Sequence, residues 1–430
     1  MDKKQQVVSW LDDHAEELIR ILSKFIQIPS YTGLGEQDMQ MAVKAELESA
    51  GLQVETRAFD EEQVRPCVLA TYPGTGGGKT LLLDAHSDTV PVHESEKWDK
   101  DPFCGEFDGT WIHGRGSTDD KWGIAAGIMA LRALKECGVE LKGDVQLLSS
   151  VAEESSFLSR RDVGAGAMVK AMEKKPDFCI ICEESSKTIG TETPRSMGFV
   201  IHVSGKAVHT CIRRQCIYPQ NAGISSGSTV GVDALQKAML VIDALYRLER
   251  DLAPNHNRGG LVGTGGKPGA PRSTIGAVTI NPVEIRGGGP NALMANVSIR
   301  YSCHFSSTYT HEELRGLIED TIRGVAMTDL WLRENPPVFE LRATNNGFAS
   351  DPDHPAVDIM CQAHAQVEGR EAIVTSWVAG CDADAIIPYA PCVVYGPTGA
   401  NAHAANERSK PKDILAAAKV YALTAMDYCK

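Results

Sequence analysis

Several short stretches of this chain place acidic or imidazole side chains where chemistry is usually done. His86 and Asp88 stand at the end of the apolar run 81–83. Such a run is typical of a buried strand, and ligands of these sheets sit at the carboxyl ends of the strands. Residues i and i+2 of a strand point to the same side, so the carboxylate of Asp88 can hold the imidazole of His86. A buried histidine with a purely structural role is the alternative.

Carboxylates recur at similar positions further along the chain. Asp119-Asp120 follows a glycine-rich turn, Glu153-Glu154 follows the apolar run 144–151, and Glu183-Glu184 follows the run 178–182. Helix capping accounts for one aspartate of the first pair, but not for both. Adjacent carboxylates repel each other unless a cation or a proton lies between them. Together with His403, in a turn after the run 392–395, this recurrence predicts a shared metal site.

Carboxylate and imidazole donors of this kind suit zinc, although Co²⁺ or Mn²⁺ can substitute. Zinc lowers the pKa of bound water from ~16 to ~7, and a second metal can polarise a carbonyl group. Amide hydrolysis at neutral pH requires a hydroxide, which a metal site of this kind can supply. One glutamate without a metal would then take the proton of the water. The residues alone leave open whether Glu153 or Glu154 has that role.

The elements around these residues indicate an α/β protein with a mixed central sheet. Helices are expected over 1–30, 36–51, 124–137 and 355–367, and strands over 53–59, 67–72, 81–86, 144–151, 178–182, 372–377 and 392–395. The glycine-rich stretch 73–80 is a turn between strands, because a strand follows it where a phosphate-binding loop needs a helix.

From residue 196 the pattern changes to strand, helix, strand, strand, helix, strand, over 198–205, 232–252, 274–285, 295–305, 310–325 and 338–342. This order is typical of a ferredoxin-like α+β domain. Thr310 and Glu313 predict a capping box, and the glycine-rich stretch 259–269 a surface loop. We therefore expect a catalytic domain in two parts, 1–195 and 346–430, with an inserted domain at 196–345.

The composition argues against some partners. The net charge of -13 disfavours nucleic acid and anionic membranes, and the start of the chain lacks the apolar stretch of a signal peptide or membrane span. The twelve cysteines are scattered, which favours reduced thiols in a cytoplasmic protein. Cys179 and Cys182 have no second pair at zinc-finger spacing.

Taken in order, these motifs resemble the dinuclear-zinc deacylase and exopeptidase family. The matching stretches are His86-x-Asp88, Gly114-Arg115-Gly116-x-x-Asp119, Glu153-Glu154, Glu183, and the ending Gly396-Pro397 with His403 and Glu407. Members of this family include acetylornithine deacetylase, succinyl-diaminopimelate desuccinylase, aminoacylase and carboxypeptidase G. The resemblance implies a zinc-exopeptidase-like catalytic domain with two zinc ions per subunit.

The resemblance also implies roles for particular residues. One metal is held by His86, Asp119 and Glu183, and the other by His403, Asp119 and Glu154, so that Asp119 bridges them. Glu153 matches the general base, and Asp88 the residue that orients His86. The peptide bond between Asp119 and Asp120 is expected to be cis.

In this family the inserted domain is a lid and a dimer interface. His209 matches a residue that reaches into the partner subunit's site, although an exposed strand histidine is the alternative, and Asn291 resembles a substrate-facing asparagine. Trp122 departs from the family pattern between Lys121 and Gly123.

A second departure is Asp384, which stands where many members carry an arginine that grips a substrate carboxylate. An aspartate at this place predicts that the substrate presents a neutral or cationic group to it, unless another arginine binds the substrate carboxylate. The candidates for that rescue are Arg213, Arg214, Arg286 and Arg300.

The leading functional hypothesis is a metal-dependent deacylase that cleaves the amide bond of a small N-acyl amine or N-acyl amino acid. A dipeptidase or carboxypeptidase with the same two metals is the alternative. A metal-containing binding protein without catalysis is the hypothesis from a different class. The expected partners are a small-molecule substrate and a second copy of the chain in a homodimer.

Overall fold

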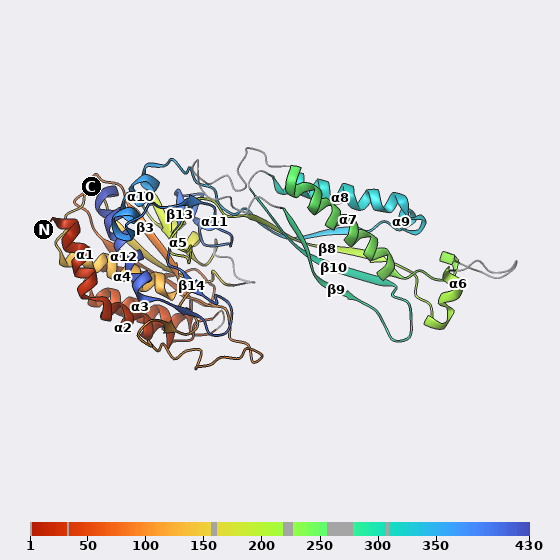
Figure 1. Cartoon of the computed structure of the whole chain (residues 1–430), viewed down its shortest axis with the longest axis horizontal. Helices are drawn as coiled ribbons and strands as arrows, with labels where there is room; N and C mark the ends of the chain where they lie inside the picture. Colours follow the sequence, from red (N-terminus) through yellow and green to blue (C-terminus); the bar gives the residue numbers. More distant parts are fainter. Residues whose placement is uncertain (1, 32–33, 156–160, 218–226, 256–277, 307–308) are drawn as a thin grey trace. The chain divides into compact units, whose positions relative to one another are not determined.

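The computed structural model describes residues 2–31, 34–155, 161–217, 227–255, 278–306 and 309–430. They form two compact units, one with the described residues up to 193 and from 348 onward, the other with those of 194–347 (Figure 1). The stretch 259–269 and the start of the strand expected at 274 lie outside the described residues.

The first unit is built on an eight-stranded sheet with the order β1-β2-β5-β3-β6-β13-β7-β12. Strand β3 runs parallel to β5 and β6, whereas β1 and β2 are antiparallel to each other. The mixed sheet predicted from the sequence is thus confirmed. The strands are β1 (Gln53–Ala58), β2 (Pro66–Tyr72), β3 (Leu81–His86), β5 (Val145–Ser150), β6 (Phe178–Ile181), β7 (Ile189–Gly190), β12 (Val374–Thr375) and β13 (Cys392–Val394).

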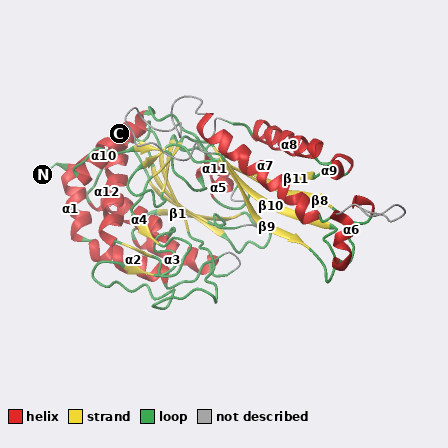
Figure 2. Cartoon of the chain, turned by 45° about the vertical axis from the view of Figure 1, so that its right-hand side comes forward, coloured by secondary structure: helices red, strands yellow, loops and turns green. Residues whose placement is uncertain are grey.

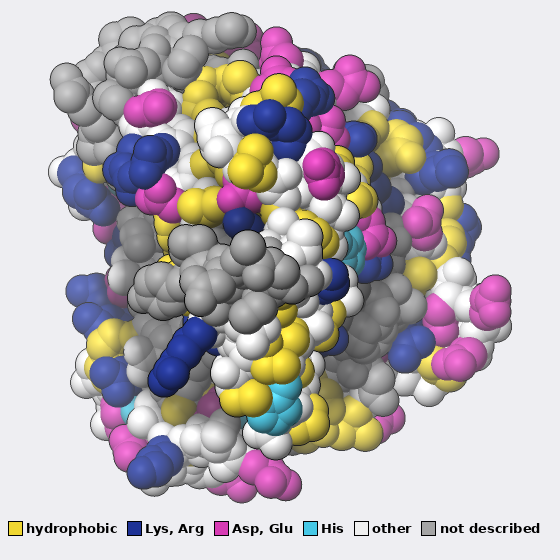
Figure 3. Space-filling view, turned by 90° about the vertical axis from the view of Figure 1, so that its right-hand side faces the viewer, with side chains coloured by type: hydrophobic (Ala, Val, Ile, Leu, Met, Phe, Trp, Pro, Cys, Tyr) yellow, Lys and Arg dark blue, Asp and Glu magenta, His cyan; other side chains and the backbone are white. Residues whose placement is uncertain are grey.

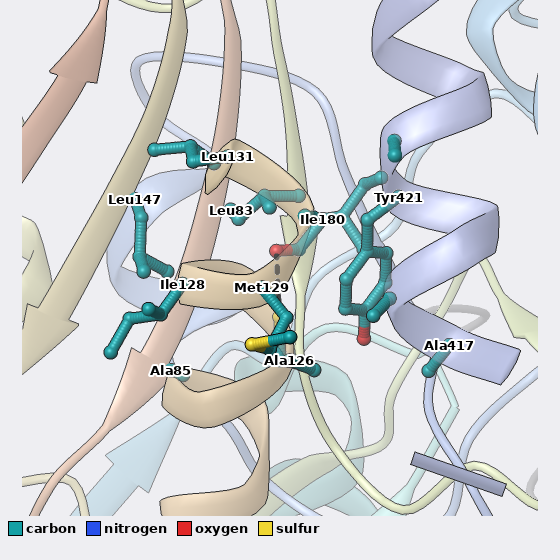
Figure 4. Close-up of a cluster of buried hydrophobic side chains, with 14 of the residues drawn as sticks. Leu83, Ala85, Ala126, Ile128, Met129, Leu131, Leu147, Ile180, Ala417 and Tyr421 are labelled. Carbon is teal, nitrogen blue, oxygen red and sulfur yellow. Dashed lines mark hydrogen bonds between the residues drawn. The ribbon is translucent and has the colours of Figure 1, made fainter. Parts of the chain in front are cut away.

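Helices flank this sheet. They are α1 (Lys3–Asp13), α2 (Ala15–Ile26), α3 (Glu36–Ser49), α4 (Lys121–Glu136), α5 (Ala165–Ala171), α10 (Pro355–Glu368), α11 (Ala383–Ile386) and α12 (Pro411–Tyr428). Helix α4 packs against strands β3 and β5 and against α12, with Ile128 and Met129 among the buried side chains of Figure 4. Gly127 allows this approach, because a Cβ atom there would lie 2.5 Å from Leu147.

Two predictions about this unit need correction. The single helix expected over 1–30 is two helices, which meet at His14, whose Nδ1 lies 2.7 Å from the backbone oxygen of Trp10. The strand expected over 372–377 pairs only at Val374–Thr375, where it joins the edge of the sheet beside β7.

A small three-stranded sheet connects distant parts of the first unit. It has the order β14-β15-β4, with β4 (Ile112–His113), β14 (Gly399–Ala400) and β15 (Arg408–Ser409). Strand β4 precedes the turn to Asp119, and the other two flank His403. The pairing therefore fixes two candidate ligand loops against each other.

The second unit has the predicted ferredoxin-like order. Its antiparallel sheet runs β11-β8-β10-β9, and helices α7 and α8 lie along one side of it (Figure 2). Thr310 and Glu313 form the expected capping box. The elements are β8 (Arg195–Ser204), α6 (Arg213–Ile217), α7 (Ala234–Asn255), β9 (Thr279–Gly287), β10 (Asn296–Phe305), α8 (His311–Thr328), α9 (Leu330–Glu334) and β11 (Val338–Asn345), with short 3-10 turns at Thr210–Ile212 and Gly227–Thr229.

The surface is mixed in character. On the face seen in Figure 3, basic and acidic side chains alternate among apolar ones. Among the described residues, no helix has the length and apolar character needed to cross a membrane. The twelve cysteines are all described, and all are free.

Helices α2 and α3 are joined by an ion cluster that gives a stability prediction. Glu46 is buried and pairs with Arg20 at 2.9 Å and Lys24 at 2.8 Å. The hydrogen bond from Arg20 and the pair with Lys24 overcome desolvation and lower the pKa of Glu46 to about 2. A lowered pKa stabilises the fold above the unfolded-state value, and this stabilisation is lost as pH falls toward 2.

Glu46→Gln is expected to reduce the free energy of unfolding by about 1 kcal/mol at pH 7, because Arg20 is half exposed and water screens the pair. Urea unfolding of the metal-free protein at pH 7 and pH 3.5 measures the effect, which should shrink at the lower pH. Glu48→Gln, on an exposed position of the same helix, is the control. A loss that stays constant with pH would contradict the electrostatic explanation.

Candidate metal centre

Parallel strands bring the predicted ligands to one edge of the central sheet. His86 is the last residue of β3 and pairs with Ser150, the last residue of β5. Glu183 follows the end of β6, which pairs with β3 through Asp84 and Ile181. Because all three strands end at this edge, their apolar runs deliver polar side chains to the same place.

Two groups of potential ligands meet at Asp119. The first contains His86, Asp119 and Glu183, the second contains Asp119, Glu154 and His403, and the ligand atoms within each group lie within 4.8 Å of one another. Oδ1 of Asp119 lies 2.9 Å from Nε2 of His86, and Oδ2 lies 2.9 Å from Nε2 of His403. The two oxygens thus face different histidines, as a bridging carboxylate requires.

The surroundings raise the pKa of three of these ligands and so favour their protonated forms. Hydrogen bonds with Asp119 and Glu154 raise the pKa of His403 to about 10. Burial lowers the pKa of His86, but its hydrogen bond with Asp119 and the neighbouring carboxylates hold it well above its usual range. Burial, with the charges of Asp119 and Asp120, raises the pKa of Glu183 well above its usual range. Protons occupy positions that divalent cations can take over.

Glu153 belongs to neither group of ligands. It is buried, and its charge acts on His86, so it lies close to the first group. The backbone N–H groups of Glu153 and Glu154 donate to the carboxylate of Asp88 at 3.2 and 3.0 Å. Asp88 therefore fixes the peptide that carries both glutamates.

Asp88 contacts His86 through its backbone oxygen and, at a longer distance, through its carboxylate, so its expected orienting role stays a prediction. Nδ1 of His86 lies 2.9 Å from the backbone oxygen of Asp88, and 3.7 Å from its carboxylate. The carboxylate is farther away because β3 ends at His86, so the alternation of side chains on a strand does not extend to Asp88. The main chain of Asp88 holds the imidazole, and its side chain holds the loop 153–154.

The turn before α4 has the conformation expected from the resemblance. The peptide bond between Asp119 and Asp120 is cis. Trp122 does not form a wall of the site, because its side chain is fully buried and its Nε1–H donates to the backbone oxygen of Thr118 at 2.8 Å. The indole also packs on Gly396, where a Cβ would lie 2.4 Å from the ring. The extra bulk of Trp122 thus belongs to the core.

Asp384 has a partner that the sequence did not indicate. It is buried on α11, and its Oδ2 lies 3.7 Å from the guanidinium of Arg161, which also donates to its backbone oxygen. The four arginines suggested from the sequence were candidates for binding a substrate carboxylate, and that role stays a prediction. No pattern in the sequence signals the pair, because Arg161 and Asp384 are far apart in the chain.

His209 and Asn291 lie together in the second unit. His209 is exposed and forms an isolated β-bridge with Ala292, and the N–H of Thr210 donates to the backbone oxygen of Asn291 at 3.1 Å. Nδ1 of His209 accepts from the N–H of Cys211 at 3.3 Å and lies 3.0 Å from its sulfur. The two residues predicted to face substrate thus come from neighbouring loops.

Glu407 was expected only as part of the family ending, yet it is fully buried against the loop 114–119. A signal was available in the sequence, since an acid shortly after His403 can bind the glycine-rich turn Gly114-Arg115-Gly116.

The nitrogen and carboxylate donors of both ligand groups fit zinc or a similar divalent metal. The fold and the site together define a hydrolase with a candidate centre for two metals.

Residues 82–427 match the family described as Peptidase family M20/M25/M40. The match covers most of the chain, and the protein belongs to this family of metal-dependent hydrolases. The expectation from the sequence motifs is therefore confirmed.

Relatives with assigned names match along nearly their full length. The N-formyl-4-amino-5-aminomethyl-2-methylpyrimidine deformylase of Bacillus subtilis is 27% identical, over 97% of this chain and 96% of its own. The succinyl-diaminopimelate desuccinylase of Methylocella silvestris is 25% identical, over 98% of this chain and 100% of its own. Among solved structures, the di-peptidase Dug1p of Saccharomyces cerevisiae superposes with a TM-score of 0.72 at 16% identity, covering 100% of this chain and 99% of its own.

The shared position of Asp119 gives a prediction about metal content. Asp119→Ala is expected to lower tightly bound Zn²⁺ from about two ions per chain to less than about half an ion, because both groups lose a ligand. Metal analysis after dialysis against a fixed zinc concentration measures this. Glu106→Gln, an exposed glutamate, is the control. Two tightly held ions in the Asp119 variant would refute the shared ligand.

Proposed function

We propose that this hydrolase removes an acyl group from a small N-acyl amine or N-acyl amino acid, using two zinc ions. The observation that carries the proposal is Asp119, whose two carboxylate oxygens lie 2.9 Å from His86 and from His403. One ion would be held by His86, Asp119 and Glu183, and the other by Asp119, Glu154 and His403. Bound divalent metals at such a site make water more acidic and polarise an amide carbonyl.

Glu153 is proposed as the general base. It is an acid beside the first ligand group, and it supplies no ligand atom to either group. It would take the proton of the attacking water and pass it to the leaving amine. Asp88 supports this role through its hydrogen bonds to the N–H groups of Glu153 and Glu154, which fix where the two glutamates stand.

The proposed substrate class rests on the named relatives. The two kinds of relative described above are named as a deformylase and a desuccinylase, and both match almost the whole chain. A dipeptidase is the second candidate, favoured by the fold shared with Dug1p. The pair between Asp384 and Arg161 weakens the argument for a neutral or cationic substrate group, because the carboxylate is not an isolated charge.

The second unit is proposed to act as lid and dimer interface. His209 and Asn291 come from adjoining loops of that unit, and His209 is exposed. In this proposal His209 would help hold the oxyanion from a partner subunit, and Asn291 would contact the acyl group. A cytoplasmic location is proposed from the twelve free cysteines.

A substrate panel tests the proposed activity. N-formyl, N-acetyl and N-succinyl compounds are expected to be hydrolysed with kcat/KM at least about tenfold above that for dipeptides, because a deacylase site recognises the acyl group. A chelator should abolish the activity, and added Zn²⁺ should restore it. A preference for dipeptides would favour the second candidate, and no hydrolysis of either class would support the non-catalytic hypothesis.

Glu153→Gln is expected to reduce kcat by ~10² to 10⁴-fold with both metals retained, because it removes proton transfer without removing a ligand. Steady-state kinetics and metal analysis measure the two effects. The exposed Glu173→Gln variant is the control. A variant with more than a tenth of the wild-type kcat would contradict the assignment of Glu153 as the general base.

Mixing two inactive variants tests the partner-subunit role of His209. A mixed dimer of His209→Ala with Glu153→Gln is expected to regain up to about a quarter of wild-type activity, because one of its two composite sites has both residues intact and half of the dimers are mixed. Native mass spectrometry confirms subunit exchange. Exchange without recovered activity would count against a site shared between subunits.

A further inference from the structure

Glu407 is an acid that neither ligand group uses, although it lies next to them. Its Oε1 accepts from the backbone N–H groups of Gly116, Thr118 and Asp119 at 3.0, 2.8 and 3.2 Å. Its Oε2 accepts from Nη1 of Arg115 at 2.6 Å. The side chains of Arg115 and Glu407 are both almost fully buried. The carboxylate thus organises the loop that ends in Asp119.

The loop is shaped to surround this carboxylate. Gly114 and Gly116 have φ angles of +134° and +87°, which other residues rarely adopt. A Cβ at Gly116 would also lie 2.7 Å from the side chain of Lys121. Successive N–H groups that converge in this way form a binding site for an anion, and here the anion is a side chain from the same protein.

Glu407 also belongs to the segment that carries His403. Its backbone oxygen accepts from the N–H of Gly114 at 2.9 Å, and the following residues of β15 pair with β4. The hydroxyl of Thr118 adds a hydrogen bond to the backbone oxygen of Arg408 at 2.9 Å. The loop of Asp119 and the loop of His403 are therefore fixed to each other around one carboxylate.

We infer that Glu407 is a positioning residue that sets the distance between Asp119 and His403, and with it the affinity of the second ligand group for metal. This inference rests on the metal assignment in the proposed function. Two of the three ligands in the second group stand on the loops that Glu407 joins. In the first group, His86 and Glu183 follow strands of the central sheet, so only Asp119 depends on Glu407.

A different explanation is that Glu407 only stabilises the fold. Removing one partner of a buried ion pair is destabilising wherever the pair lies. A purely structural role would lower the stability of the metal-free protein and leave the ratio of the two metal affinities unchanged. A positioning role changes that ratio, because the two ligand groups depend on Glu407 to different extents.

Stepwise binding of Co²⁺ to the metal-free protein separates these explanations. Glu407→Gln keeps the shape of the side chain, but it loses the charge that faces Arg115 and the loop amides. One of the two equivalents of Co²⁺ is expected to bind about 10- to 100-fold more weakly, as for other residues that support metal ligands, and the other to change by less than about fivefold. Calorimetry and metal content at fixed free Co²⁺ give both affinities.

Glu36→Gln is the matched control, since it removes the charge of another buried glutamate that pairs with an arginine, Arg65 at 2.8 Å, on helix α3. If Glu407→Gln does not fold, Thr118→Val removes a hydroxyl between the two loops, and it is expected to weaken one equivalent several-fold more than the other. Equal weakening of both equivalents, or of neither, in the folded variant would overturn the inference. A wild-type protein that binds fewer than two equivalents would instead contradict the metal assignment and remove the basis of the inference.

Discussion

Repulsion among buried carboxylates is the constraint on which the rest of this structure depends. Asp84, Asp88, Asp120 and Glu183 are all buried, and each lies near enough to His86 for the charge of that imidazole to act on it. The candidate ligand groups among the described residues contain two imidazoles, His86 and His403. Carboxylates in such surroundings must take up protons or bind cations. Metal binding is therefore coupled to the protonation of this region and contributes to the stability of the fold.

The fold meets this constraint with two kinds of support. The central sheet holds the ligands that follow β3 and β6, because backbone hydrogen bonds between parallel strands fix their register. Asp119 and His403 stand on loops, and loops need other partners. The carboxylate of Glu407 and the small sheet of β4, β14 and β15 supply them. The sheet thus fixes the ligands at the ends of β3 and β6, and contacts between two loops fix Asp119 and His403.

Two residues that depart from the family pattern, Trp122 and Asp384, have partners in the structure. The side chain of Trp122 is buried in the core, where it packs on Gly396. Asp384 is paired with Arg161, so its charge is compensated. The reaction class is that of the family, and the choice of acyl group and amine belongs to the proposed function.

The sequence by itself determined the mixed sheet, the ferredoxin-like order of the second unit and the candidate ligands, because apolar runs and strand ends are local patterns. Tertiary structure alone decided that the side chain of Asp88 holds Glu153 and Glu154, that Arg161 pairs with Asp384, and that Glu407 joins two loops. These contacts join residues far apart in the chain, and their geometry depends on where strands end and turns close. Local patterns carry no information about such distances, which the packing of the whole unit sets.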